Sequence, residues 1–269
     1  MNRINFIHSY INNDNFHKEQ HITIVNSLVA CLPAEEACDN VNPMLPTTDI
    51  LQHALLLHIK RDIDTHGYQK HHENLILSLI SQFKELPYNR KKSCGYWFSV
   101  LYPYLPFNTQ ENIIKILATS QYKDIRRRAY KFLNENWDDH YEYLITEIWN
   151  KYKDSQCAEI IVENFSISFI LEYFSELENV LTKAKRNIKL FLKVGKESPE
   201  LLNNIKKYDE ITYVYVLVKL GEKLSENLAI DIFKRQKKDD RIGLLLWCYG
   251  QMKLWTVLKN IVDLINGKI

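Results

Sequence analysis

The sequence predicts an all-α fold. Glycine and proline number only seven each in 269 residues, too few for the many turns of an all-β chain. Apolar residues recur at three- and four-residue spacing through most of the chain, as in amphipathic helices. Aspartates recur about thirty residues apart where one such pattern ends and the next begins, and Asp is favoured at helix N-termini. These observations indicate a series of helices joined by short polar connections.

The bulk composition excludes several classes of protein. Hydrophobic residues make up 46% and charged residues 25%, as in a soluble globular protein. The net charge of +2 creates no overall field that would attract nucleic acid or a membrane. The most apolar stretch, residues 50–59, is too short to span a bilayer, and the N-terminus lacks signal-peptide features. Five cysteines, spread through helical patterns, indicate reduced thiols and a cytoplasmic protein.

The first part of the chain is expected to be helical but less regular than the rest. Its apolar periodicity predicts helices over residues 16–32, 49–64 and 71–86. Thr48 or Asp49 can cap the second of these helices, and Gly67 lies where it should close. Residues 33–47 contain three prolines and little periodicity, so they are expected to form an irregular connection.

Three segments are expected along the chain: a helical N-terminal portion at 1–90, an aromatic joint at 91–106 and a helical array at 107–269. The joint contains one short aromatic helix, CGYWFSVLY at 94–102, between a basic trio and two prolines. Histidine usage also changes across it, because eight of the nine histidines lie at or before His72. These shifts in composition indicate that the two sides of the joint are built differently.

The array shows internal repetition with a period of about thirty residues. Tyr-Lys-Asp at 122–124 recurs at 152–154, and the acidic segments 208–210 and 238–240 are separated by the same interval. Each segment lies where one amphipathic pattern ends and the next begins, which is the position of an N-cap aspartate. Chance recurrence of Asp-capped helices in a helical bundle is the alternative interpretation.

The clearest helical pattern lies at residues 122–137. Asp124 can cap a helix that begins at Ile125, and the apolar stripe of that helix includes Ala129 and Leu133. Three consecutive arginines occupy its first turn. Successive residues point in different directions around a helix, so at least one of the three must point away from the solvent-facing side. This helix is expected to contribute a buried stripe at the centre of the array.

Residues 125–133 follow the order apolar–Arg–Arg–x–Ala–x–x–x–Leu, which resembles the second helix of a HEAT repeat. The resemblance covers roughly residues 107–265, although only the unit at 109–136 matches closely and the last two units lack the arginine. It implies a right-handed α-solenoid of antiparallel helix pairs. Such arrays bind partners along an extended face made by equivalent helices.

Basic and aromatic residues are the candidate binding groups. A helix expected over residues 178–194 carries cations at three- and four-residue spacing beside its apolar stripe. With the arginine-rich helix two units earlier, it could line a groove that tracks phosphates, with aromatic rings as stacking planes. Glutamates on the intervening helices favour the other interpretation, solvated faces and ion pairs between repeats. The candidate binding residues are Arg126, Arg127, Arg128, Lys131, Trp137, Trp149, Arg186, Lys189 and Lys193.

No catalytic residue, cofactor or metal ligand set is predicted. The sequence contains no G-x-S-x-G, G-x-x-x-x-G-K, G-x-G-x-x-G or C-x-x-C motif. His17 and His21 are four residues apart, but they lack the H-E-x-x-H order and are interpreted as lying at the margin of a buried face. His71 and His72 fall at a helix end, and neither they nor Cys38 show a recognisable ligand spacing.

The sequence therefore predicts a non-enzymatic binding module or adaptor that engages a protein partner through the face of a helical array. The charge is balanced, so a protein partner is favoured over nucleic acid, and no membrane partner is expected. Sixteen tyrosines and five tryptophans supply residues that are enriched at the centres of interfaces.

The alternative function is DNA binding through the basic ridges. Bacterial alkylpurine DNA glycosylases are HEAT-like arrays of similar size, and the resemblance implies an aspartate beside tryptophans in a basic cleft. Trp137 with Asp138, and Trp149 with Asp154, are the residues to which this resemblance applies. Both aspartates can also be explained as helix caps.

Overall fold

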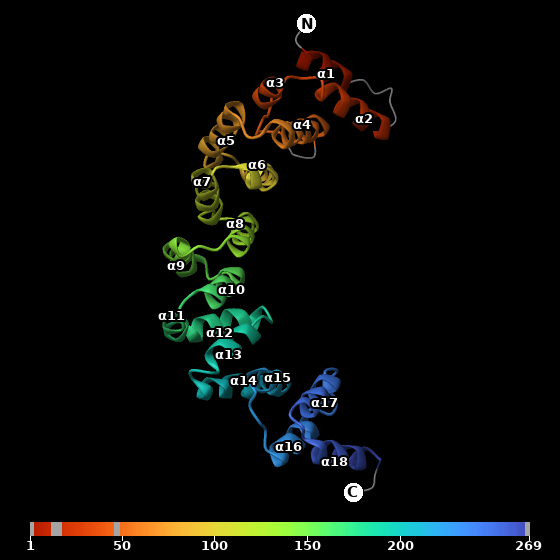
Figure 1. The fold of residues 1–269 in the computed structure, drawn as a ribbon, viewed down its shortest axis with the longest axis vertical. Coiled ribbons are helices and arrows are strands. Elements are labelled where there is room, and N and C mark those ends of the chain that lie inside the picture. Colours follow the sequence, from red (N-terminus) through yellow and green to blue (C-terminus); the bar gives the residue numbers. More distant parts are fainter. Residues whose placement is uncertain (1–2, 12–17, 46–48, 267–269) are drawn as a thin grey trace. The chain divides into compact units, whose positions relative to one another are not determined.

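The computed structural model describes residues 3–11, 18–45 and 49–266, and within these ranges every regular element is a helix (Figure 1). The predicted all-α class is thereby confirmed. The chain divides into two compact units, unit 1 at Met1–Leu144 and unit 2 at Ile145–Ile269. None of the described helices is long and apolar enough to cross a membrane.

Unit 1 consists of helices joined by short connections. These helices are α1 (Arg3–Ile11), α2 (Lys18–Val29), α3 (Ala34–Asp39), α4 (Ile50–His66), α5 (Lys70–Phe83), α6 (Tyr88–Leu101), α7 (Phe107–Ala118) and α8 (Lys123–Glu135). Short 3-10 helices follow α6 and α8, at Tyr102–Tyr104 and Asp139–Tyr141. The helix α9 (Glu142–Tyr152) begins in unit 1 and continues into unit 2.

Unit 2 is built in the same way. Its further helices are α10 (Ser155–Asn164), α11 (Ile167–Glu172), α12 (Phe174–Lys183), α13 (Ile188–Val194), α14 (Leu202–Tyr208), α15 (Glu210–Leu220), α16 (Glu226–Gln236), α17 (Ile242–Gln251) and α18 (Trp255–Ile265). A 3-10 helix at Pro199–Leu201 precedes α14.

Within each unit, many helices pack against the next helix but one. In unit 1, α4 packs against α6, α5 against α7, and α6 against α8. In unit 2, α10 packs against α12, α13 against α15, α15 against α17, and α16 against α18. Alternate helices are therefore direct neighbours in space, and the apolar side chains between them make up the core of each unit.

The start of α8 differs from the prediction. The helix begins at Lys123 rather than Ile125, because its hydrogen-bond ladder already starts from the carbonyl of Tyr122. The prediction that Asp124 caps this helix was therefore wrong. Asp124 lies in the first turn, where a carboxylate suits the helix dipole, and it accepts a hydrogen bond of 2.6 Å from the Tyr88 hydroxyl.

The buried face of α8 agrees with the predicted stripe, since Ala129 and Leu133 are both 0% exposed. Arg126 is the arginine that leaves the solvent-facing side, and it is only 4% exposed. Its guanidinium donates to the carbonyl of Ser120 at 2.8 Å. A buried cation needs such an acceptor, so Arg126 joins α8 to the segment that follows α7.

The cap predicted for α4 at Asp49 and its closure at Gly67 are confirmed, although the helix runs to His66 rather than to residue 64. Asp49 caps this helix by accepting from the backbone N–H groups of Leu51, at 3.0 Å, and Gln52, at 3.3 Å. Gly67 ends it with a φ of 79°, a left-handed value that glycine adopts without steric cost. Thr48, the other predicted cap, lies outside the described residues.

Residues 33–47 are not irregular throughout, as the prolines had suggested, because α3 forms within them. Pro33 directly precedes α3, and Glu35 and Glu36 lie in its first turn, where the helix dipole favours carboxylates. Cys38 is buried in its last turn and contributes to the packing of α3 on α4 and α5. Six residues are too few to show helical periodicity in a sequence.

α6 is longer than the short aromatic helix expected at 94–102. It begins directly after Pro87 and includes the basic trio in its first turns. Trp97 and Phe98 are buried in its centre. Because α6 contacts α4 and α5 as well as α8, most of residues 91–106 is packed inside unit 1.

The single helix expected over residues 178–194 is interrupted between α12 and α13. Lys185 adopts a left-handed φ of 57°, and the N–H of Arg186 donates to the carbonyl of Leu181 at 2.8 Å. This 6→1 hydrogen bond is the pattern that terminates many helices, usually with glycine at the left-handed position. Since lysine occupies that position here, periodicity alone could not indicate the break.

Candidate functional site

The candidate binding residues of α8 lie on different sides of the helix. Arg126 is buried, and Arg128 is half-buried with its guanidinium donating to Ser99 Oγ at 3.0 Å. Arg127 and Lys131 are exposed. Of these four cations, Arg127 and Lys131 are therefore the ones placed to meet a partner.

The two tryptophans among the candidate binding residues also differ in exposure. Trp137 is half-buried, and its Nε1 donates to Asp139 Oδ1 at 3.2 Å. Trp149 is 0% exposed in the core of unit 2, and the ammonium of Lys153 lies 4.6 Å from its ring centroid. Because a side chain without exposed surface cannot contact a partner, Trp149 contributes to the fold.

The cations around α13 lie against α10. Arg186 Nη1 is 2.9 Å from Glu159 Oε2, and Lys189 forms an ion pair with Glu163 that raises the pKa of the lysine. Lys193 donates to a backbone carbonyl just after α10 at 2.9 Å, and burial lowers its pKa. The contacts of Arg186 and Lys189 are ion pairs between helices, as the alternative interpretation of this basic segment expected. They leave little uncompensated positive charge for phosphates.

Exposed apolar side chains gather instead on the surface shared by α13, α15 and α17, which we name the α13–α15–α17 face. Ile188 of α13 and Leu244 and Trp247 of α17 are 36%, 37% and 44% exposed. Tyr208, the last residue of α14, is 49% exposed beside this face. The Trp247 ring centroid lies 6.4 Å from that of Tyr215 on α15. Apolar side chains that gather in an exposed patch are typical of an interaction site.

A cleft of about 810 Å³ opens on this face. Its walls come from residues 182–188, 208–212 and 238–244, which are the turns leading into α13, α15 and α17 and their first residues. This volume lies in the usual range of ligand pockets, which combine apolar walls with a few fixed polar groups.

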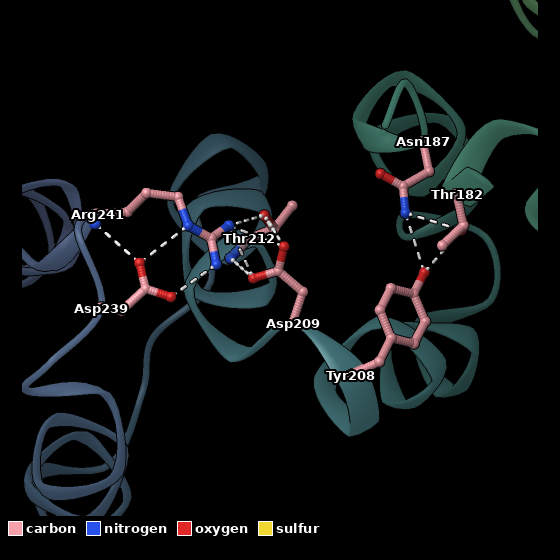
Figure 2. Close-up of polar contacts among 7 residues, drawn as sticks. All are labelled: Thr182, Asn187, Tyr208, Asp209, Thr212, Asp239 and Arg241. Atoms are coloured by element: carbon pink, nitrogen blue, oxygen red, sulfur yellow. Dashed lines mark hydrogen bonds and ion pairs between the residues drawn. The ribbon is translucent and has the colours of Figure 1, made fainter. Parts of the chain in front are cut away.

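Arg241 joins two helix starts within the cleft (Figure 2). Its Nη1 donates to both carboxylate oxygens of Asp209, at 3.1 and 2.9 Å, and its Nη2 donates to Asp239 Oδ2 at 3.0 Å. Asp209 also caps α15, since its Oδ1 accepts from the N–H of Thr212 at 3.0 Å. Burial raises the pKa of Asp209, but the hydrogen bonds from Arg241 and Thr212 outweigh it and hold that pKa below its usual value.

Tyr208 extends the polar network toward α12 and α13 (Figure 2). Its hydroxyl accepts from Asn187 Nδ2 at 3.0 Å and lies 3.1 Å from Thr182 Oγ1. Asn187 Nδ2 also donates to Thr182 Oγ1 at 3.1 Å, so two hydrogen bonds fix the orientation of this amide. Burial raises the pKa of Tyr208, so its hydroxyl stays protonated at neutral pH.

This arrangement is suited to recognition. Its donors and acceptors are fixed by one another, and exposed apolar side chains flank them. The residues that line the described cleft include no histidine or cysteine, and Arg241 already engages Asp209 and Asp239.

Replacing Asp209 with Ala is expected to lower the free energy of unfolding by about 2 kcal/mol. The variant loses the cap on α15 and the charge-assisted hydrogen bonds from Arg241. Asp209→Asn keeps a capping oxygen and should lose about half as much. Urea denaturation of the two variants measures the difference, and equal stability of wild type and Asp209→Ala would contradict the role of this network.

The contribution of Asp209 should depend on pH. Its pKa is lower in the folded chain than the usual value of 3.8, so its stabilisation is present above that value and lost as pH falls through the folded-state pKa. Between about pH 5 and pH 2, wild type should therefore lose more stability than Asp209→Asn. Because the other carboxylates are the same in both proteins, the difference isolates Asp209; parallel losses would contradict the assignment.

Sequence reasoning did not identify Arg241 or Trp247 as parts of a site. The thirty-residue interval predicted N-cap aspartates near Asp209 and Asp239. Asp209 is the N-cap of α15, but Arg241 rather than an aspartate is the N-cap of α17. No feature of the sequence indicates that the guanidinium of Arg241 bridges these two carboxylates. Trp247 lies in a strongly apolar helix, where the sequence cannot show which side chains remain exposed.

A second cluster that the sequence did not indicate lies in unit 1. Cys38, His71 and His72 were expected to lack ligand geometry, but the structure brings a potential ligand atom of each within 4.8 Å of the others. The packing of α3 on α5 causes this proximity, and α3 itself was not predicted. His17, part of the other histidine pair considered, lies outside the described residues.

Comparisons with known proteins identify no relative of this chain. The sequence is matched by no family model, and neither a curated protein nor a solved structure matches it. The polar network and exposed apolar side chains of the α13–α15–α17 face are therefore the features from which a function is inferred.

Proposed function

We propose that this protein is a non-enzymatic binding module or adaptor that engages a protein partner through the α13–α15–α17 face of a HEAT-like helical array. The observation that carries the proposal is the set of exposed apolar side chains, Ile188, Leu244 and Trp247, beside the network held by Arg241. Aromatic and arginine side chains at the centre of a surface with a polar surround are typical of protein interfaces.

The contacts between alternate helices support the array. α13 contacts α15, and α15 contacts α17, as equivalent helices do in stacked helix pairs. In a right-handed solenoid of antiparallel pairs, such helices line one continuous face. The exposed side chains named above lie on these helices, so the array presents them together to one partner.

Charge favours a protein over nucleic acid as the partner. The cleft contains the cations Lys185, Lys238 and Arg241, but Asp209, Asp239 and Asp240 match them in number. Binding of a phosphate backbone draws on uncompensated positive charge. A surface with balanced charge and exposed apolar groups gains more from a partner that buries the apolar groups and pairs the polar ones.

No specific observation among the described residues favours the DNA glycosylase alternative. Asp138 accepts from the N–H of His140 at 3.0 Å and lies 2.6 Å from its Nδ1, so it serves as a cap of the 3-10 helix. Asp154 is only 4% exposed. Neither carboxylate lines the cleft of the α13–α15–α17 face.

Affinity purification from the native host, with and without nuclease, tests the proposed function. We expect a protein partner that survives nuclease treatment, is lost from Trp247→Ala and is retained by Trp255→Ala. Trp255 is a matched control, because it is 65% exposed but lies on α18. Recovery that depends on nucleic acid, or equal recovery by all three proteins, would contradict binding through this face.

A further inference from the structure

Three elements of unit 1 bring metal-ligand atoms together at one buried position. Cys38 lies in α3, and His71 and His72 lie in the first turn of α5. The Nε2 atoms of the two histidines are 3.0 Å apart, and Cys38 Sγ lies within 4.8 Å of a ring nitrogen of each. Asp62 of α4 adds a carboxylate oxygen, which is 3.1 Å from His72 Nε2 and 3.4 Å from His71 Nε2.

The position is shielded from solvent. His72 is 1% exposed and Cys38 4%, while the side chains of His71 and Asp62 are 19% and 14% exposed. Burial raises the pKa of Cys38 to about 12, and the neighbouring carboxylates add to this effect. Burial also lowers the pKa of His72, with a further contribution from His71. The Cys38 thiol is therefore protonated at neutral pH, and burial favours the neutral form of the His72 imidazole.

We propose that Cys38, Asp62, His71 and His72 form a Zn²⁺ site that joins α3, α4 and α5. Thiolate and imidazole ligands select zinc over magnesium or calcium, which prefer oxygen. In a tetrahedral zinc site, neighbouring nitrogen and oxygen ligands are roughly 3.3 Å apart. The separations of 3.0, 3.1 and 3.4 Å among His71, His72 and Asp62 are near this value. Asp62 is not part of the 4.8 Å group that Cys38 forms with the two histidines, so zinc binding must draw Cys38 and Asp62 closer together.

The charges of the site balance. Zn²⁺ displaces one proton from the Cys38 thiol to solvent, and the thiolate and the Asp62 carboxylate together neutralise the ion. The ligand geometry of Asp62 is already supported, because its other oxygen, Oδ1, lies 2.9 Å from His66 Nδ1. Outer hydrogen bonds of this kind orient metal ligands.

Coordination also changes the start of α5. The N–H of Gln69 donates to His72 Nδ1 at 3.0 Å, so the ring proton of neutral His72 lies on Nε2. When Nε2 binds zinc, this proton moves to Nδ1 and the hydrogen bond from Gln69 is lost. The amide hydrogen of Gln69 should therefore exchange faster in the zinc-bound protein, while those of α3 exchange more slowly.

Titration of the reduced, chelator-treated full-length protein with Co²⁺ tests the site. We expect a thiolate-to-cobalt charge-transfer band and strong d–d bands of tetrahedral cobalt, saturating at one ion per chain and displaced by Zn²⁺. Cys38→Ser should lose the charge-transfer band, whereas Cys31→Ser should keep it. Cys31 is a matched control, since it is an exposed cysteine seven positions earlier in the chain.

His71→Gln is a second test variant. Because the His71 side chain is partly exposed, this substitution is expected to leave the protein folded. It should weaken Co²⁺ binding by at least about tenfold, whereas His53→Gln, at an exposed position of α4, should leave binding unchanged. Circular dichroism establishes that each variant is folded. The proposal is overturned if the wild type gives no charge-transfer band, if Cys38→Ser keeps it, or if His71→Gln binds Co²⁺ as the wild type does.

Discussion

Replacing Leu133 with Asp is expected to unfold the centre of unit 1. Leu133 is 0% exposed in α8, which packs against α6 and α7. An unpaired carboxylate at this position costs several kcal/mol, which is on the order of the whole stability of a domain. Far-ultraviolet circular dichroism should therefore show reduced helicity and a much lower melting temperature. Ala129→Asp, on the same buried stripe, should behave in the same way.

Lys131→Asp is the matched control for this effect. Lys131 lies on the exposed side of the same helix, so its replacement tests whether an additional aspartate in α8 lowers stability when it is not buried. We expect a change of within about 0.5 kcal/mol, as is usual for surface substitutions. A Leu133→Asp variant with wild-type helicity and melting temperature would remove α8 from the core.

Replacing Trp149 with Ala is expected to lower the free energy of unfolding by about 3–5 kcal/mol, the usual range for a large aromatic side chain lost from a core. Trp149 is 0% exposed, and its removal leaves a cavity in unit 2. Its Nε1 is buried without a hydrogen-bond partner among the described residues. Trp149→Phe should therefore cost less, because it also removes an unsatisfied donor.

Chemical denaturation of Trp247→Ala and Trp149→Ala compares the loss of an exposed tryptophan with the loss of a buried one. The 44% exposed Trp247 should leave stability nearly unchanged, whereas the buried tryptophan should not. If Trp149→Ala were as stable as the wild type, Trp149 would not be a core residue. It would then return to the group of candidate contacts for a partner.

Helix positions could be predicted where apolar periodicity runs through several turns, as in α4 and α8. Local cap chemistry located the ends of α4, because Asp49 and Gly67 act within one turn of the helix. The break between α12 and α13 and the short α3 escaped prediction. A lysine in the left-handed position ends α12, and six residues are too few to show a period.

The candidate site could be predicted only in part, because it depends on contacts between helices. Asp209 was placed at a helix start from local sequence, but the guanidinium that holds it comes from Arg241, 32 residues later in the chain. Likewise, α8 and α9 both show apolar periodicity with cationic or aromatic side chains. Only their packing shows that Arg126 and Trp149 are buried.

The proposed function rests on the α13–α15–α17 face, and an equilibrium titration of the nuclease-resistant partner tests it most directly. We expect Trp247→Ala to weaken binding by about 30-fold, equivalent to the 2 kcal/mol of a hot spot, with an unchanged melting temperature. Trp255→Ala should bind as the wild type does. Wild-type affinity of the folded Trp247→Ala variant would contradict the account.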